Sequence, residues 1–446
     1  MKTNRIAVAP SHNFILLCVA AALLAIVAGS LETARAQLAS SDRERGRSML
    51  RTIKLQIEKN YYDQTFHGVD LDARFKEADE ALKKATTNSE MFGIIGQAVV
   101  DLNDSHTRFI PPARASRTEY GWRMQIIGTR CFIVAVNPKS DAQAKGLKVG
   151  DELLSLNGYE PTRDNLWKMK YAYYALRPQP GMVLVVKSPG GEPRELTVLS
   201  KIIMGKRLIE FKDIFELIRQ EESEAYLSRH RYYEDMGGVF IWKMPQFDLS
   251  DGQVDDMMNK VAKHKALILD LRGNGGGYES TLQRLIGNMF DRDIKIGEIK
   301  RRKETKPLIA KSRGEKAFNG RLVVLVDSDS GSASEIFARV VQLEKRGLVL
   351  GDITGGKVMR SMVHPLEHGT YQIIYYALSI TDADVIMTDG KSLENVGVVP
   401  DEKLLMSGLA LATSQDPVLS IAAAKVGLKL DPKKAGSLFP IEWESK

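Results

Sequence analysis

The feature that most constrains the fold is a regular alternation of short apolar runs and amphipathic stretches between Gly238 and Gly351. Short apolar runs are typical of buried strands, and apolar residues spaced three or four apart indicate helices. The pattern predicts strands at 238–242, 266–271, 322–326 and 348–351, and helices at 251–264, 279–290 and 332–344. Strands that alternate with helices favour an α/β core with a mostly parallel sheet.

The rest of the chain divides by composition into further segments. We expect a signal peptide at 1–36, an N-terminal helical domain at 37–112, a small β-rich domain at 113–202, the α/β core at 203–405 and a C-terminal helical extension at 406–446. Helices are expected at 71–84, 89–102 and 165–176, a strand at 131–136, a hairpin turn at 188–191 and a charged helical connector at 211–228. The basic stretch from Lys300 to Arg313 is interpreted as a surface loop, and a last helix is expected from Asp416 onward.

The first residues have the pattern of an export signal. Lys2 and Arg5 precede an apolar run at 14–29, and small residues around Ala36 suit a cleavage site. The run is short for a bilayer span, which needs about 20 residues. We therefore expect a periplasmic or secreted protein with no stable membrane span, an uncleaved anchor being the alternative.

Charge and cysteine content exclude several classes of function. Removal of residues 1–36 lowers the formal charge from +7 to +5 because three basic residues and one acidic residue are lost. This charge is too small to indicate nucleic-acid binding. Cys131 is then the single cysteine, so no intramolecular disulfide is expected, and no Cys/His cluster has metal-ligand spacing. We expect no metal and no cofactor.

The candidate catalytic residues are Ser332 and Lys357, 25 positions apart. A serine hydroxyl is a weak nucleophile near pH 7 and needs a base to take its proton. A lysine with the reference pKa of about 10.4 would need that pKa lowered by roughly 3 units, about 4 kcal/mol, to serve near neutral pH. The sequence therefore predicts an apolar site in which no carboxylate contacts the ammonium group.

Ser332 is expected at a strand-to-helix turn, where free backbone N–H groups favour developing negative charge. Ala333 and Gly276 are the candidate N–H donors of an oxyanion hole, Gly276 lying in the glycine-rich run after the strand 266–271. Each pattern has a structural alternative. Ser332 and Glu335 also fit a helix capping box, and a run of glycines also fits a plain turn.

These three motifs together resemble those of the carboxy-terminal processing peptidases, or tail-specific proteases. The motifs fall on Asp270–Gly277, Ser330–Glu335 and Thr354–Val358. The resemblance implies a Ser/Lys dyad, with Ser332 as nucleophile and Lys357 as base. It also implies that 113–202 is a PDZ domain, inserted in or preceding the core, with its Gly-Leu-x-x-Gly-Asp signature at Gly146–Asp151.

Two departures from the family pattern leave alternatives open. Ser361 stands where the family usually has a glutamine that orients the lysine, which keeps a non-proteolytic ligand-binding protein on the same fold in view. His106 and Glu394 are placed like the histidine and glutamate of tricorn-type proteases, which use Ser/His/Glu. The alternative for His106 is a purely structural role as a histidine at a helix end.

The prediction from sequence is thus an exported serine endopeptidase. A PDZ domain binds an extended peptide as an added strand and commonly holds its free carboxylate. The expected substrates are proteins or peptides with free C-termini, and the chain could form a homo-oligomer.

Overall fold

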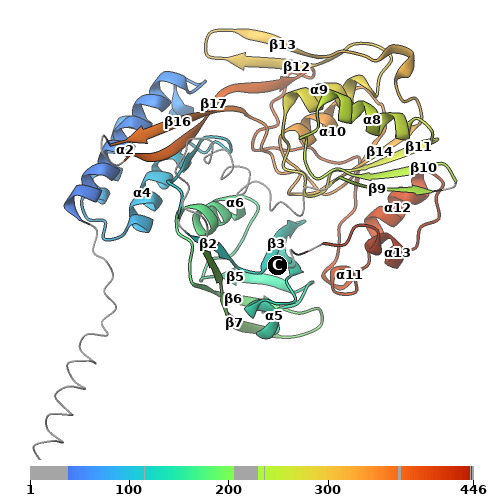
Figure 1. Ribbon diagram of the computed structural model, residues 1–446. Coiled ribbons are helices and arrows are strands. Elements are labelled where there is room, and N and C mark those ends of the chain that lie inside the picture. Colours follow the sequence, from blue (N-terminus) through green and yellow to red (C-terminus); the bar gives the residue numbers. More distant parts are fainter. Residues whose placement is uncertain are drawn as a thin grey trace, which may run out of the picture.

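The computed structural model describes residues 39–114, 116–204, 230–235, 237–369, 373–441 and 443. The expected signal peptide and the connector at 211–228 lie outside the described residues. An α/β core, a block of N-terminal helices and a small sheet domain make up most of the described chain (Figure 1).

The core is built on a six-stranded sheet with the order β18-β15-β14-β11-β10-β9. Its first five strands run parallel to their neighbours, and only the edge strand β9 is antiparallel. The predicted mostly parallel sheet is therefore confirmed. The strands are β9 (Arg231–Asp235), β10 (Val239–Lys243), β11 (Ala266–Asp270), β14 (Arg321–Val326), β15 (Leu348–Gly351) and β18 (Glu402–Lys403).

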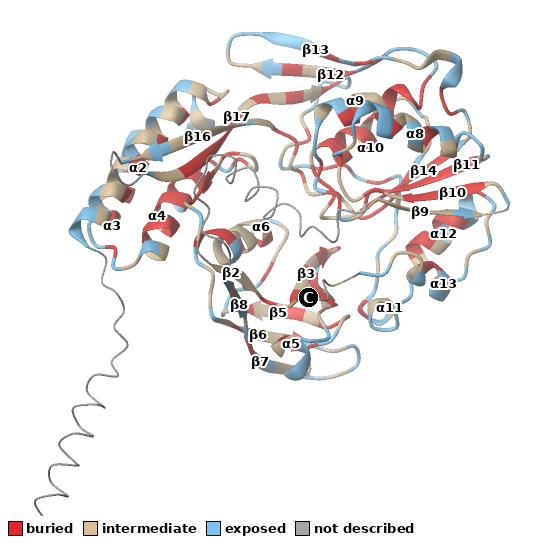
Figure 2. Ribbon diagram, viewed as in Figure 1, coloured by how far each residue is buried: buried red, intermediate tan, exposed pale blue. Residues whose placement is uncertain are grey.

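Helices cover both faces of this sheet, which is why its central strands are apolar throughout (Figure 2). One face packs against α8 (Asp251–Val261), α9 (Glu279–Gly287) and α10 (Ala333–Leu343). The other packs against α12 (Pro417–Lys425) and α13 (Pro432–Ser437), which follow the short helix α11 (Gly408–Ala412). The predicted helices of the core and the C-terminal helix are confirmed, with ends that differ by a few residues.

A second sheet is antiparallel and did not follow from the sequence. It contains β1 (Arg108–Ile110), β12 (Ile294–Arg301), β13 (Thr305–Ala310), β16 (Arg360–His368) and β17 (Ile374–Met387). The prediction of a loop at 300–313 was wrong, because β12 and β13 form a hairpin there; a short 3-10 turn, η3 (Gly314–Lys316), follows. A bulge between Lys295 and Gly297 interrupts the alternation of buried and exposed residues that would have revealed β12.

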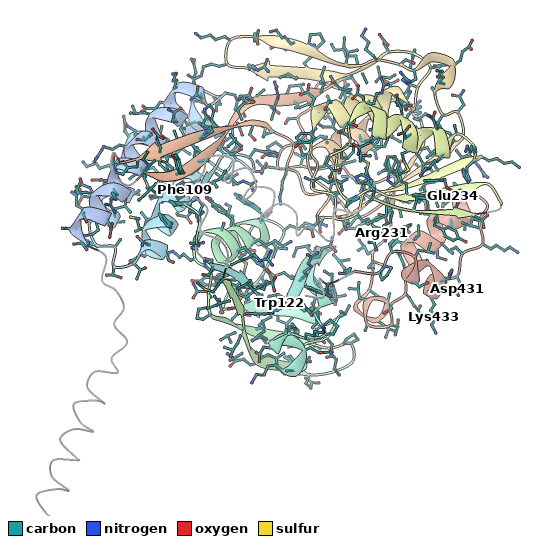
Figure 3. The ribbon with its side chains drawn as sticks, viewed as in Figure 1. Phe109, Trp122, Arg231, Glu234, Asp431 and Lys433 are labelled. Carbon is teal, nitrogen blue, oxygen red and sulfur yellow. The ribbon has the colours of Figure 1, made fainter. Side chains whose placement is uncertain are left out.

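The N-terminal helices α2 (Ser40–Asn60), α3 (Leu71–Leu82) and α4 (Asn88–Val100) pack around a hydrophobic core that β1 and β17 also line. Tyr376 and Leu378 of β17 are buried among them, together with Phe109 of β1, which Figure 3 labels. The predicted helices at 71–84 and 89–102 are confirmed. The block also contains a 3-10 turn, η1 (Phe66–Gly68).

The small sheet domain is a five-stranded antiparallel sheet with strands in chain order. It comprises β3 (Trp122–Ile127), β4 (Arg130–Val136), β5 (Glu152–Leu156), β6 (Gly181–Lys187), β7 (Pro193–Leu199), α5 (Asp141–Ala144), α6 (Leu166–Lys170) and the π-helical turn η2 (Tyr171–Leu176). A separate two-stranded ribbon of β2 (Ser116–Glu119) and β8 (Lys201–Met204) adjoins its ends. The predicted strand at 131–136, helix at 165–176 and hairpin are confirmed.

Two further findings concern single features. Cys131 lies buried in β4, where burial raises the pKa of its thiol to about 12 and leaves it protonated at neutral pH. A search of the helices in the described ranges finds none with the length and apolar character that crossing a bilayer requires.

Candidate active site

Ser332 lies immediately before α10, at the end of the loop that leaves β14. Its backbone has φ +53° and ψ −118°, a conformation that non-glycine residues rarely adopt. Such strain persists only where surrounding contacts enforce it, and it is common at catalytic positions. Ser332 is half-buried, whereas the residues that follow it in α10 are buried. The serine therefore stands at a helix N-terminus, as the sequence predicted.

The structure brings Ser332 and Lys357 together through their backbones. The Ser332 N–H donates to the Lys357 carbonyl oxygen at 2.7 Å. Lys357 lies in the loop between β15 and β16, which crosses the N-terminal end of α10. The two residues are thus immediate neighbours in space despite the helix and strand that separate them in sequence.

The surroundings of Lys357 favour an uncharged amine. Burial lowers the pKa of Lys357 below its ordinary value of 10.5, and the positive charges of Lys170 and Arg108 act in the same direction. Asp329 and Glu335 oppose the shift. Within the described residues, no carboxylate oxygen lies within 4.0 Å of the Lys357 amine. This is the setting that a lysine base requires.

Glu335 connects the nucleophile to the lysine loop. One oxygen of its buried carboxylate accepts the Ser332 N–H at 3.0 Å and the Lys357 N–H at 2.8 Å. The other accepts the Gly356 N–H at 2.8 Å and the Thr354 hydroxyl. Burial raises the pKa of Glu335 to about 7, and these four hydrogen bonds oppose the rise. One side chain thereby fixes the backbone at both candidate catalytic positions.

The glycine-rich run after β11 lies directly against the nucleophile. A Cβ atom on Gly276 would lie 2.5 Å from the Ser332 Cβ and 3.1 Å from the Ala333 nitrogen. Gly276 also has φ +106°, which disfavours any other residue. A glycine is therefore required where this backbone approaches Ser332, so the run is more than a plain turn.

The two predicted oxyanion donors differ in this structure. Among the described residues, the Ala333 N–H donates to no protein group. The Gly276 N–H, in contrast, donates to the Asn274 side-chain oxygen at 2.8 Å and is not available to an oxyanion in this conformation. The neighbouring Gly277 N–H has no acceptor among the described residues.

Hydrogen bonds tie the glycine-rich run to the nucleophile loop and to the sheet. The Asn274 carbonyl accepts the Gly331 N–H and the Ser334 hydroxyl, both at 2.9 Å. The Asn274 amide donates to the Met244 carbonyl after β10, and the Gly273 N–H donates to Asp327. The run, the nucleophile loop and the strand ends form one rigid unit.

A buried ion cluster stands at the start of this unit. Arg272 pairs with Asp270 and with Asp416, whose carboxylate also caps α12. Lys243 is a fourth member, 3.2 Å from Asp270. The positive charges of Arg272 and Lys243 keep the pKa of Asp270 well below its usual range, although burial alone would raise it. The C-terminal helices are thus anchored directly beside the glycine-rich run.

His106 and Glu394 lie next to the lysine loop and are linked through Ser105. His106 Nδ1 lies 2.7 Å from the Ser105 hydroxyl in a hydrogen bond, and the Ser105 N–H donates to Glu394 at 3.1 Å. The other Glu394 oxygen accepts the Val358 N–H at 2.8 Å. Burial lowers the pKa of His106 to about 4, Lys357 being one of the charges that act on it. His106 is thus a neutral imidazole at pH 7 beside the candidate site.

Ser361 lies at the start of β16, where its hydroxyl accepts a hydrogen bond from Ser379 at 3.1 Å. No hydrogen bond joins Ser361 to Lys357 among the described residues. Its role as a partner of the lysine stays a prediction.

The small sheet domain contacts the nucleophile loop at several points. Gln125 of β3 donates to Asp327 at 2.7 Å, and the Ser328 hydroxyl donates to the Ile126 carbonyl. Lys170 of α6 pairs with Asp329 at 3.4 Å. Arg163 of the same domain forms an ion pair, 2.6 Å long, with Asp352 of the lysine loop. The domain therefore contacts both loops that carry the candidate dyad.

The roles of several of these residues could not be predicted from the sequence. Glu335 was interpreted only as part of a helix cap, and its side chain does accept the Ser332 N–H, but its bonds to the lysine loop depend on residues that are distant in the chain. Ser105 and Asn274 carried no recognisable signal beyond their place in the motifs.

The described residues contain no group of three or more His, Cys, Asp or Glu side chains arranged to hold a metal ion.

Comparison with known proteins identifies the family that the core resembles. Residues 239–404, the strands and helices that carry Ser332, Lys357 and the glycine-rich run, match the model of peptidase family S41. The core is thus similar to the peptidases of family S41. The match and the carboxyl-terminal-processing relatives support a serine-type peptidase.

Longer similarities extend beyond this S41 core. A carboxyl-terminal-processing protease of Picosynechococcus sp. is 23% identical over 404 residues, covering 86% of this chain and 88% of that protein. The structure of mature CPAF complexed with lactacystin has a TM-score of 0.62 at 16% identity, covering 88% of this chain and 98% of that one. The photosystem II D1 C-terminal processing protease has a TM-score of 0.51 at 18% identity, covering 90% and 100%. The fold of these two solved proteins therefore extends over most of this chain.

Proposed function

We propose that this S41 peptidase is an exported endopeptidase that cleaves proteins and peptides after recognising their C-terminal tails, with Ser332 as nucleophile and Lys357 as base. The observation that carries the proposal is the strained Ser332 held by a backbone hydrogen bond against a buried lysine whose pKa is lowered. Curated relatives named as carboxyl-terminal-processing proteases support the substrate class.

In the proposed mechanism the neutral Lys357 amine accepts the Ser332 hydroxyl proton while the serine oxygen attacks the scissile carbonyl. The Ala333 N–H, at the N-terminus of α10, donates to the developing oxyanion. A second donor comes from the Gly276–Gly277 segment, either Gly277 as it stands or Gly276 after release from Asn274. Lys357 then returns the proton to the leaving amine, and water hydrolyses the acyl-enzyme.

We propose further that the small sheet domain is a PDZ domain that binds the substrate tail. β3 is an edge strand of its sheet, and the helical segment α6–η2 packs beside the start of β3, where the Tyr120 hydroxyl donates to the Tyr173 carbonyl at 3.0 Å. An edge strand beside a helix is the geometry in which an extended peptide adds to a sheet. The contacts of β3 and α6 with the nucleophile loop support this proposal, because a peptide added to β3 would then lie close to that loop.

The test is digestion of a disordered protein and of a model peptide by the mature chain and by Ser332→Ala, with products read by mass spectrometry. Peptides with a free carboxylate should be cleaved at least several-fold faster than the same peptides amidated at the C-terminus, and Ser332→Ala should be inert. Equal rates on free and amidated peptides would contradict tail recognition. Cleavage by Ser332→Ala would contradict the assignment of the nucleophile.

One observation favours a second candidate for the base. His106 is neutral, is oriented by Ser105 and connects through it to Glu394, which is the arrangement of a histidine base. We compare the two candidates by substitution. Lys357→Ala should abolish cleavage and His106→Ala should leave most of it; the reverse result would assign the base to His106.

A further inference from the structure

Trp443, the last described residue of the chain, lies against the small sheet domain. After α13, Leu438 and Phe439 pack on the core, where the Arg231 guanidinium lies 5.7 Å from the Phe439 ring centroid. Arg231 also donates to the Pro440 carbonyl at 2.6 Å. Figure 3 labels Arg231 on the side of the core that faces the C-terminal helices. The chain is thus held to β9 as far as Pro440.

Three residues later the chain contacts a different domain. The Trp443 ring lies under the Arg123 guanidinium of β3, 5.6 Å from the centroid. Arg123 follows Trp122, the β3 residue labelled in Figure 3. Pro440 contacts the core and Trp443 contacts the small sheet domain, and the three residue steps between these contacts can span at most about 10 Å.

The contact between Trp443 and Arg123 lies at the start of β3, where further aromatic side chains gather. Tyr120, just before the strand, meets Tyr174 of η2 edge-on, with ring centroids 5.1 Å apart. Burial raises the pKa of the Tyr174 hydroxyl, and the nearby Arg123 charge opposes that rise. Arg123 therefore lies between the helical segment and the tail. These residues flank the edge of β3 to which a substrate peptide would add.

Charge favours the same contact. In the sequence, Trp443 stands between Glu442 and Glu444, whose charge is opposite to that of Arg123. A guanidinium over a tryptophan face is the most favourable cation–π pair, although it is worth only about 0.5–1 kcal/mol where it is exposed. A weak contact suffices here, because a tethered segment is present at an effective concentration of about millimolar.

The same strand, β3, also contacts the nucleophile loop. Arg123 and Gln125 alternate with the buried residues of β3 and so share a face of the strand. Arg123 contacts the tail, and Gln125 donates to Asp327, five residues before Ser332. A ligand that adds along β3 would meet both contacts.

We propose that the chain's own C-terminal segment, anchored by Trp443 on Arg123, is an intramolecular ligand of the small sheet domain that a substrate tail must displace. The inference rests on the proposed function for its consequence, competition with substrate, but the docking of the tail stands independently. The occupant is this tail, and the contact is made within one chain.

The first experiment measures the docking without any substrate. A fluorescein-labelled peptide of residues 438–446 is titrated with a chain that ends at Pro440, and binding is followed by anisotropy. The peptide should bind saturably to the shortened chain and at least threefold more weakly to the full chain, whose site is occupied. Arg123→Gln in the shortened chain should weaken binding. Absence of binding to the shortened chain overturns the proposal whether or not the protein recognises substrate tails.

The second experiment measures competition. A labelled model peptide with a free C-terminus is titrated with Ser332→Ala chains that carry the natural tail, Trp443→Ala or Trp443→Phe. Removal of the tryptophan should tighten the dissociation constant by about three- to tenfold, the range expected when a weak tethered competitor is lost. Trp443→Phe keeps an aromatic face and should bind like the natural tail.

The outcomes separate the two proposals. Equal dissociation constants in all three chains would overturn competition by the tail. If no chain binds the model peptide while the 438–446 peptide does bind, substrate recognition by the domain fails and docking of the tail stands. A full chain that dimerises in sedimentation runs, while the chain ending at Pro440 stays monomeric, would overturn docking within one chain and assign the tail to a second copy.

Discussion

At the scale of single residues, the closest approach in the site is that of Gly276 to Ser332. Gly276→Ala would place a Cβ atom 2.5 Å from the Ser332 Cβ at a φ of +106°, so either the serine or the glycine-rich run must move. We expect a loss of activity of at least 100-fold, because small displacements of reacting groups have effects of about this size. Steady-state kinetics on a peptide substrate checks this.

The adjacent glycine provides a matched control. A Cβ atom on Gly275 would meet nothing within 4 Å, and its φ lies outside the left-handed region. Gly275→Ala should therefore retain most of the activity. Similar losses in both variants would mean that the run needs flexibility throughout rather than close approach at one position.

Glu335 is expected to act as a positioning residue. In Glu335→Gln an amide NH₂ replaces one carboxylate oxygen, so two of the four donors now bonded to Glu335 face another donor. An unsatisfied buried donor costs about 1–3 kcal/mol, so we expect kcat to fall by about tenfold or more while KM changes little. Steady-state kinetics that determine kcat and KM separately measure this effect.

Glu344→Gln, at the other end of α10, is the control for this substitution. Glu344 pairs with Arg292 on the surface, where such pairs contribute little. The variant should keep full activity. A Glu335→Gln enzyme with unchanged kcat would show that the carboxylate does not hold Ser332 and Lys357 in place.

At the scale of elements, the buried ion cluster makes the C-terminal helices part of the active-site framework. Asp416→Ala removes a partner of Arg272 and the cap of α12, leaving a buried positive charge in excess. We expect the free energy of unfolding to fall by about 3–5 kcal/mol, as when one member of a buried pair is removed. Denaturant unfolding followed by fluorescence measures this.

Asp431→Ala, which removes the exposed cap of α13, separates capping from charge burial. Loss of a cap alone costs about 1 kcal/mol. Equal effects of the two substitutions would contradict a role for the ion cluster.

The elements also show what the sequence can and cannot predict. The parallel sheet was predictable because its central strands β10, β11, β14 and β15 are buried on both faces and so appear as local apolar runs. The second sheet was not, since its pairs join distant segments: Arg108 of β1 lies opposite Ser379 of β17. Local periodicity carries no information about such pairing.

The same limit applies to the site. The motifs placed Ser332, Lys357 and Gly276 at one location because each follows a strand of the sheet. The fourfold acceptor role of Glu335 depends on residues 19 to 22 positions later, so the local pattern indicated only a helix cap. The engagement of the Gly276 N–H by Asn274 likewise depends on side-chain placement that no sequence pattern reports.

At the scale of the whole molecule, three parts converge on two loops. The core supplies the nucleophile and lysine loops, the N-terminal region supplies His106 and Ser105, and the small sheet domain contacts both loops through Gln125 and Arg163. A substrate tail bound to β3, or the chain's own tail, would therefore lie against the same structure that holds the dyad. Under the proposed function, specificity and chemistry depend on separate domains.

The pH dependence of the activity distinguishes Lys357 from His106 as the base. A base is active when deprotonated, so activity rises with pH up to the pKa of the base and is constant above it. Burial lowers the pKa of Lys357 below 10.5, which moves this rise toward neutral pH, whereas burial lowers the pKa of His106 to about 4.

The most direct test of the Ser332–Lys357 dyad is the pH dependence of kcat/KM, measured for the natural enzyme and for His106→Ala. We predict a single rise across the neutral to alkaline range, with the same midpoint in both enzymes. A profile that is already flat from about pH 5 and collapses in His106→Ala would contradict the account and make the histidine the base.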